Sequence, residues 1–303
     1  MPLTPQSAAL LEANRKGNLP IHEMSVHQMR ELIRRTAIPP TTEIFEWFDV
    51  QAPTRDGSAA VRVYRPGEAT DLPVLMYLHG SGFAIGDLDM HDEYLRNLAN
   101  AADVVIVSVD YRLAPEHPFP AGLDDCVDVW NWLLTGPEQV PGDVSRLAVG
   151  GDSAGGSLSF GVVQRARDEG GRVPDVVVTA YGSTEMRVSN PELGREDNCV
   201  LTNEGCEWFW DMYVPDPARR AERYCSPAAA TELSGLGANL VMTAEYDPTR
   251  DATEEYARRL EAAGNPVTLT RYDGVMHGFF TILSFPEAHR ALDQTVAFLK
   301  EHL

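Results

Sequence analysis

The pattern Gly151-Asp152-Ser153-Ala154-Gly155 is the feature of this chain most specific for chemistry. It fits Gly-x-Ser-x-Gly, in which a sharp turn lifts a serine hydroxyl above the end of a strand. Small residues must flank the serine because the turn is tight and its backbone is strained. A strand pattern over Arg146–Gly150 precedes the motif and a helical pattern over Ala154–Asp168 follows it, which is the context that such a nucleophile elbow requires. We therefore predict that Ser153 is a nucleophile.

A serine hydroxyl needs a base, and the base needs a carboxylate that orients it. Asp247 directly follows the predicted strand Leu240–Tyr246, and His277 follows the predicted strand Val267–Tyr272 after a short loop. Because open α/β sheets place their sites at the carboxyl ends of the strands, we predict that both side chains meet Ser153 there. Asp251 is expected to begin the next helix instead. The remaining histidines fall on helices or in loops that suit the role of base less well: His22, His27, His79, His91, His117, His289 and His302.

A glycine-rich loop, His79-Gly80-Ser81-Gly82-Phe83, follows the apolar strand Val74–Leu78. Such a loop brings backbone N–H groups close to the oxyanion of a tetrahedral intermediate. The sequence lacks the Gly-Lys-Ser/Thr or Gly-x-Gly-x-x-Gly continuation of a phosphate-binding loop. We expect His79 to stabilise this loop rather than to act as the base.

Composition limits the classes of partner. The 303 residues are 44% hydrophobic and 23% charged, and the formal net charge is −20. This acidic balance argues against nucleic acid or an anionic membrane surface as a partner, since both attract basic patches. The chain contains only two lysines, Lys16 and Lys300. Codon bias in a GC-rich genome is the interpretation that we favour, and adaptation to high salt is the alternative.

The sequence predicts a cytoplasmic protein. Its beginning has no signal-peptide pattern, and no stretch reaches the length of a membrane span. The cysteines, Cys126, Cys199, Cys206 and Cys225, have no metal-binding spacing. We expect them to be reduced and partly buried, and a disulfide between Cys199 and Cys206 is the less favoured alternative. No metal or organic cofactor is implied.

Strand and helix patterns alternate from about residue 74 onward, which predicts a largely parallel sheet with helices on both faces. Before that, Ser25 and Gln28 suggest a capping box in a helical N-terminal part, and a strand hairpin turns at Arg55–Ser58. Residues 185–225 interrupt the alternation with short helical patterns and several aromatic residues. Long excursions of this kind usually cover an active site, and we expect one or two of the rings to face the pocket.

Taken together, these motifs resemble those of the hormone-sensitive-lipase-like (family IV) esterases of the α/β-hydrolase superfamily, in the branch with a Gly-Asp-Ser-Ala-Gly elbow. The resemblance also includes Tyr111–Ala121, Asp247–Asp251 and His277–Phe279, in the family's order. It implies an α/β-hydrolase fold of eight mostly parallel strands with a helical cap. We expect residues 1–42 and 185–225 to form the cap, and residues 43–184 and 226–303 to form the core.

The resemblance also implies a serine carboxylesterase that acts on small-molecule esters with short-to-medium acyl chains, of roughly four to eight carbons. The Ser153–His277–Asp247 triad and the backbone N–H groups of Ser81, Gly82 and Ala154 would carry the reaction. The family usually has a third glycine where this chain has Ser81. We expect that position to have a negative φ, so that serine is tolerated; a supporting role of its hydroxyl is the alternative.

The sequence has two alternative interpretations of its function. An amidase or arylacetamide-type deacetylase would use the same triad. A non-catalytic ligand receptor, as in the plant gibberellin receptors, would lack the catalytic histidine, and the intact His277-Gly278-Phe279 argues against it. A homodimer is left open.

Overall fold

The computed structural model describes residues 2–303 except residues 18, 37 and 38. The expectation that residues 1–42 are part of a cap therefore includes four positions, 1, 18, 37 and 38, that lie outside the described residues.

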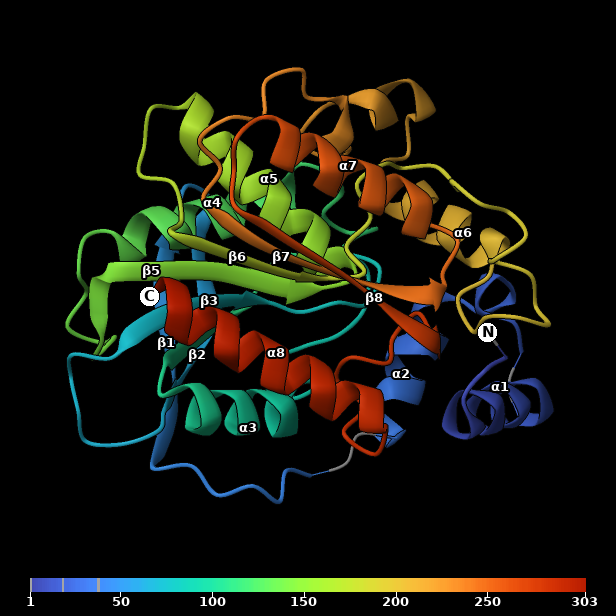
Figure 1. Ribbon diagram of the computed structural model, residues 1–303, viewed down its shortest axis with the longest axis horizontal. Coiled ribbons are helices and arrows are strands. Elements are labelled where there is room, and N and C mark those ends of the chain that lie inside the picture. The colour runs from blue at the N-terminus through green and yellow to red at the C-terminus, as the bar shows by residue number, and fades with distance from the viewer. Residues whose placement is uncertain (1, 18, 37–38) are drawn as a thin grey trace.

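In the described part of the chain, eight strands form one sheet in the order β1-β2-β4-β3-β5-β6-β7-β8 (Figure 1). The pairs β1–β2 and β2–β4 are antiparallel, and the other neighbours are parallel. The predicted mostly parallel sheet with an antiparallel edge is therefore confirmed. The strands are β1 Glu46–Thr54, β2 Gly57–Arg65, β3 Pro73–Leu78, β4 Val105–Asp110, β5 Asp143–Asp152, β6 Val176–Ala180, β7 Ala238–Tyr246 and β8 Val267–Met276.

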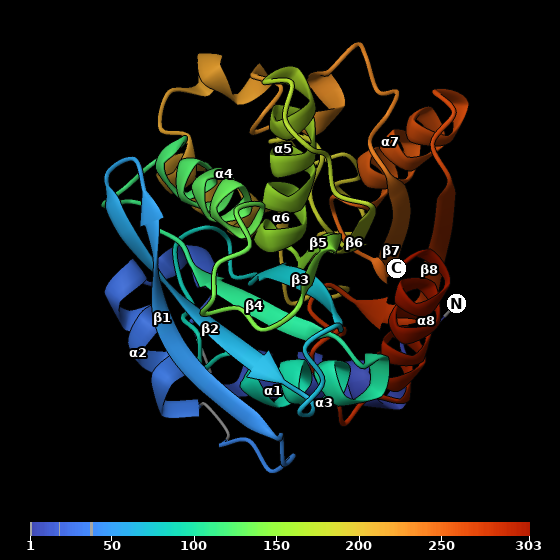
Figure 2. The same ribbon diagram turned by 90° about the vertical axis from the view of Figure 1, so that its left-hand side faces the viewer.

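Helices cover both faces of the sheet, with α4, α5 and α7 on one side and α3 and α8 on the other (Figures 1 and 2). The side chains of β3 show why both faces need a cover. Met76 and Leu78 belong to the core beneath α4 and α5, whereas Leu75 and Tyr77 belong to the core beneath α3 and α8. The helices of the core are α3 Asp92–Ala102, α4 Ala121–Leu133, α5 Ala154–Asp168, α7 Arg250–Ala262 and α8 Pro286–His302.

The helices α1 Pro5–Gly17, α2 Val26–Thr36 and α6 Asn203–Tyr213 gather at the end of the sheet where the parallel strands terminate (Figure 1). Helix α2 begins with the predicted capping box: the Ser25 N–H donates to Gln28 Oε1 at 2.8 Å, and the Gln28 N–H donates to Ser25 Oγ at 3.2 Å. Two stretches far apart in the sequence thus lie above the same edge, as a cap requires.

Several boundaries differ from the prediction. The hairpin turns at Arg55-Asp56 alone, because Gly57, with φ 134°, already belongs to β2. Strand β8 continues four residues beyond Tyr272 to Met276 and pairs there with Tyr246 of β7. One of the short helical patterns in residues 185–225 forms a 3₁₀ helix, Pro217–Ala221, and Asp216 caps it. Each difference depends on pairing or capping that hydropathy periodicity does not detect.

Candidate active site

Ser153 occupies the turn between β5 and α5 with φ 51° and ψ −120°. The neighbouring glycines are required by close backbone approach. A Cβ at Gly151 or at Gly155 would overlap the carbonyl oxygen of Leu78 on β3. The local sequence thus folds the elbow tightly against the adjacent strand and places the serine at the start of a helix.

The structure brings Ser153, His277 and Asp247 together although they are far apart in the sequence. Ser153 Oγ lies 2.8 Å from His277 Nε2, and His277 Nδ1 lies 2.6 Å from Asp247 Oδ2. A carboxylate only accepts, so Nδ1–H donates to Asp247 and Nε2 is left to accept from the serine hydroxyl. This is the arrangement in which a histidine can take the proton of a serine nucleophile.

Strand ends and local hydrogen bonds fix the acid and the base. Asp247 directly follows β7 and is fully buried. Its Oδ1 accepts from the Thr249 N–H and hydroxyl, both at 2.8 Å, while Oδ2 faces His277. The His277 N–H donates to the Tyr246 carbonyl at 3.2 Å, and the Tyr181 ring lies 4.6 Å from the imidazole. The carboxylate and the imidazole are therefore both held in one orientation.

Asp251 is not part of this arrangement. It lies in the first turn of α7, where it accepts from Asn190 at 2.7 Å and from Arg250 at 2.8 Å. A carboxylate there interacts favourably with the positive end of the helix dipole.

The predicted oxyanion loop contains one correction. Ser81 has φ 85°, so the expected negative φ is wrong, and Gly82 and Phe83 follow with φ 63° each. The reason is a tight turn, in which the Ser81 carbonyl accepts from the N–H groups of Ala84 at 3.3 Å and Ile85 at 3.2 Å. The Ser81 hydroxyl lies 2.9 Å from Met90 Sδ. Serine therefore adopts a backbone conformation that a glycine would adopt without strain.

His79, the first residue of this loop, is buried. Its ring stacks on Tyr111 at 4.4 Å, and Nδ1–H donates to the Gly80 carbonyl at 2.9 Å. Burial lowers the pKa of His79 to about 4. A buried, neutral histidine in these contacts supports the loop and does not reach the serine through any contact that the structure records.

Sequence reasoning missed the contribution of Asp152, the residue before the serine. Its buried Oδ1 accepts from His91 Nε2 at 2.8 Å, from the Tyr77 hydroxyl at 2.9 Å and from the Gly80 N–H at 3.1 Å. Burial alone would lower the pKa of His91 and raise that of Asp152, but their mutual attraction reverses both directions. Through its hydrogen bond with Gly80, Asp152 thus connects the predicted oxyanion loop to the elbow. No sequence signal beyond its place in the motif pointed to this pairing.

Aromatic side chains of α6 enclose the cavity at Ser153. Phe209 and Trp210 line it together with His277, which confirms that one or two rings of the insertion face the pocket. The cavity measures only about 30 Å³. Tyr213, one turn further along α6, stacks on Phe83 at 3.8 Å and so holds the helix against the oxyanion loop.

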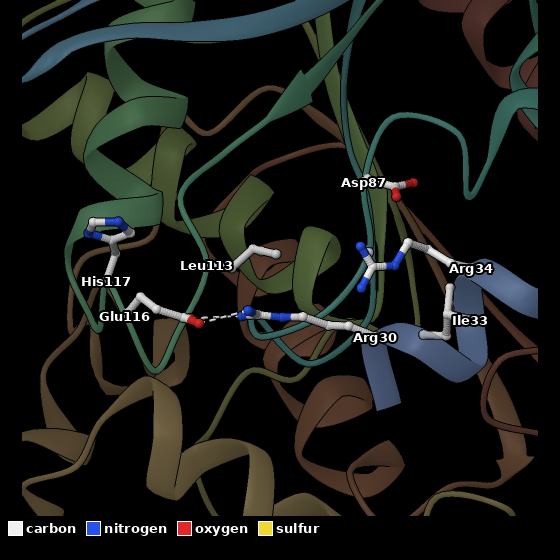
Figure 3. Close-up of a pocket in the computed structure, with 8 residues that line it drawn as sticks. Arg30, Ile33, Arg34, Asp87, Leu113, Glu116 and His117 are labelled. Carbon is white, nitrogen blue, oxygen red and sulfur yellow. Dashed lines mark hydrogen bonds and ion pairs between the residues drawn. The ribbon is translucent and has the colours of Figure 1, made fainter. Parts of the chain in front are cut away.

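A larger hollow of about 410 Å³ lies between α2 and the segment Leu113–His117 (Figure 3). Arg30 crosses it and forms a two-pronged ion pair with Glu116, at 2.7 and 2.8 Å (Figure 3). None of the predicted catalytic residues lines this hollow. The small cavity, and not the large one, is therefore the place for the chemistry.

Within the described residues, no group of three or more His, Cys, Asp or Glu side chains is arranged to hold a metal ion. The four cysteines, all in the described ranges, are buried and form no disulfide, so the alternative of a Cys199–Cys206 bridge is not realised. No helix among the described residues is long and apolar enough to cross a membrane.

Comparisons with known proteins agree with this geometry. The model of a family described as having an alpha/beta hydrolase fold matches residues 75–281. The chain is 37% identical to the carboxylic ester hydrolase LipN of Mycobacterium tuberculosis over 84% of this chain and 70% of that protein. It is 36% identical to the ethyl acetate hydrolase of Pseudomonas putida over the whole of both chains.

The fold also matches that of a solved hyperthermophilic esterase from Pyrobaculum calidifontis, with a TM-score of 0.92, 35% identity and 99% of each chain covered. The match to the solved carboxylesterase EstE1, from a metagenomic library, has a TM-score of 0.87 and 35% identity over 93% of this chain and 98% of that one. The chain therefore belongs to the hormone-sensitive-lipase-like carboxylesterases of the alpha/beta hydrolase fold family and is a carboxylic ester hydrolase.

Proposed function

We propose that this enzyme hydrolyses esters with short-to-medium acyl chains by acyl transfer through Ser153. The observation that carries the proposal is the pair of contacts at His277, 2.8 Å to Ser153 Oγ and 2.6 Å to Asp247 Oδ2. Such a serine is activated at neutral pH because the histidine can accept its proton as the hydroxyl attacks.

In the first half of the reaction, Ser153 Oγ attacks the ester carbonyl while His277 Nε2 takes the hydroxyl proton. The carbonyl oxygen becomes an oxyanion, and the N–H groups of Ser81, Gly82 and Ala154 are the donors that we assign to it. The bond to the alcohol oxygen then breaks, and His277 returns its proton to the leaving alcohol. Asp247 keeps the imidazole in the required tautomer and stabilises its charged form.

In the second half, water attacks the acyl-enzyme and gives its proton to His277. A second oxyanion forms in the same place, and the bond to Ser153 Oγ breaks as His277 protonates that oxygen. The products are a carboxylic acid and the free serine. The chain's own residues thus supply every proton transfer in the cycle.

Labelling with a fluorophosphonate tests the nucleophile. We expect one covalent adduct, on Ser153 in the mapped peptide, and loss of p-nitrophenyl butyrate hydrolysis in proportion to labelling. Ser153→Ala should abolish both. Ser157 is the matched control, because it also lines the cavity, one helical turn further on. An adduct on Ser157, or full activity of Ser153→Ala, would refute the mechanism.

The same assay addresses the alternatives. An ester and the amide of the same acyl group are compared, because the amidase alternative uses the same three residues. We expect the ester to have the higher kcat/KM. A non-catalytic receptor would hydrolyse neither substrate. The cytoplasmic location and the cap boundaries remain predictions from the sequence, and the homodimer stays open.

A further inference from the structure

The cavity at Ser153 is too small for the acyl groups that the proposed function requires. It measures about 30 Å³. A water molecule needs on the order of 10–15 Å³ of such a cavity, so about two water molecules fill it. An acyl chain of several carbons can lie wholly within it only if one of the lining side chains moves.

Phe209 is the lining side chain that limits the space beside the oxyanion loop. A Cβ added to Gly82 would overlap the Phe209 ring, so the ring lies directly against the backbone of a predicted oxyanion donor. Phe209 is 8% exposed, and Trp208 packs on it edge-to-face at 4.9 Å. The Phe209 ring is thus packed between Gly82 of the loop and Trp208 of α6.

The position of this ring indicates which part of the ester it faces. Buried side chains line the inner side of the cavity, including Trp210 and Cys206, each 3% exposed, and its other side is open. In acyl transfer the alcohol must leave toward solvent before water attacks, whereas the acyl group stays on the serine. The buried, mostly apolar side of the cavity therefore suits the acyl group, and the open side suits the alcohol.

We propose that Phe209 determines the acyl-length limit of this esterase, because its ring occupies the place that the more distant acyl carbons would take. This inference rests on the proposed function of Ser153. Shortening the benzyl side chain to the methyl group of alanine removes six carbon atoms and leaves a space that longer acyl chains can fill. Each methylene that gains apolar contact there should raise kcat/KM about fourfold.

The test uses p-nitrophenyl acetate, butyrate, octanoate and dodecanoate with the wild type and Phe209→Ala. The ratio of kcat/KM for octanoate to that for butyrate is the readout, because it does not depend on the fraction of enzyme that is folded. We expect this ratio to rise at least tenfold in Phe209→Ala. Phe209→Trp, which enlarges the ring, should lower it.

Met212→Ala is the matched control, since Met212 lies on the same helix and is partly buried but does not line the cavity. Its ratio should stay within about threefold of that of the wild type. A second control varies the alcohol of acetate esters, and Phe209→Ala should leave that preference unchanged. A larger change in the alcohol series would overturn the assignment to the acyl side.

The two proposals fail in different ways. If the wild type hydrolyses the esters and Ser153 is labelled but Phe209→Ala keeps the wild-type ratio, only the role of Phe209 is wrong. If Ser153→Ala keeps its activity, the proposed mechanism itself is wrong.

Discussion

Two serines hold backbone conformations that favour glycine, Ser153 with φ 51° and Ser81 with φ 85°. Strain of this kind, on the order of 1–3 kcal/mol per residue, persists where the surrounding structure determines the backbone. At Ser153 the elbow places a hydroxyl above the sheet. At Ser81 a glycine would adopt the same backbone conformation. We therefore expect the side chain of Ser153 to act in the reaction, whereas the side chain of Ser81 is not required for it.

The Ser81→Gly variant should keep kcat within about threefold and leave stability equal or higher by up to about 1 kcal/mol. Glycine relieves the positive φ, although the flexibility it adds to the unfolded chain offsets part of the gain. Ser81→Ala is the control, because it keeps the backbone strain and removes only the hydroxyl near Met90 Sδ. Thermal unfolding and measurements of kcat distinguish relief of backbone strain from a role of the hydroxyl. A tenfold loss of kcat in both variants, with stability unchanged, would show that the hydroxyl acts in the reaction.

Asp247 and Asp251 lie four residues apart and provide a matched pair. Asp247→Asn should lower kcat by about 10⁴-fold, because the amide favours the wrong imidazole tautomer. Asp251→Asn should keep kcat within about threefold and lose about 1 kcal/mol of stability, because its carboxylate faces the start of α7. Steady-state kinetics and thermal unfolding measure the two effects. The opposite ranking would assign the acid of the triad to Asp251.

At the scale of elements, helix α2 contacts the core through apolar side chains, including the buried Met29, and through Arg30. Its guanidinium binds Glu116 with two hydrogen bonds and also donates to the carbonyls of Ala84 at 2.8 Å and Ala114 at 2.9 Å. Ala84 follows the predicted oxyanion loop, and Ala114 and Glu116 lie in a segment joined to that loop by the Ala114 N–H, which donates to the Phe83 carbonyl at 2.9 Å. Arg30 therefore links α2 to two other segments of the chain.

We expect Glu116→Gln to lower the melting temperature at neutral pH. The Arg30 hydrogen bonds hold the pKa of Glu116 at about 2 in the folded protein, below its ordinary value of 4.5. The stabilisation is therefore present above about pH 4.5 and is lost as the pH falls toward 2. Because the Glu116 side chain is 52% exposed, we expect at most about 1 kcal/mol.

Thermal unfolding of wild type and variant at several pH values measures this effect, and the difference should shrink as the solution is acidified. Glu12→Gln is the control, because the Glu12–Lys16 pair is more exposed and should contribute almost nothing. A difference that stays constant with pH would mean that the Glu116 charge is not its source.

At the scale of the whole molecule, the net charge of −20 makes self-repulsion a significant destabilising contribution. We predict that the melting temperature at pH 7 rises with sodium chloride, since the Debye length falls from about 30 Å at 0.01 M to about 3 Å at 1 M. Near the isoelectric point of about 4.7 the same salt should have little effect. A melting temperature that falls with salt at pH 7 would mean that surface ion pairs outweigh the net repulsion.

The sequence by itself determined the features that depend on short segments and their order. The elbow motif in its strand–helix context, the helix Ala154–Asp168 and the strand end before Asp247 could all be predicted, because hydrophobic periodicity and turn chemistry are local. The strand before His277 was predicted to end at Tyr272, four residues before its observed end at Met276. The alternation of apolar strands with helices then required a covered parallel sheet. These constraints predicted the layers of the fold and placed the three predicted catalytic residues at one edge, whereas the α/β-hydrolase fold with eight strands was implied by the family resemblance.

Only the tertiary structure decided the features that depend on contacts between distant segments. The positive φ of Ser81 follows from hydrogen bonds that close a turn, the pairing of Asp152 with His91 follows from the approach of α3 to the elbow, and the Phe209 ring meets Gly82 because Tyr213 holds α6 on Phe83. No periodicity in the sequence encodes these pairings, since each depends on how two separately formed elements pack. The size of the cavity at Ser153, and with it the proposed acyl specificity, is therefore a property of the assembled fold.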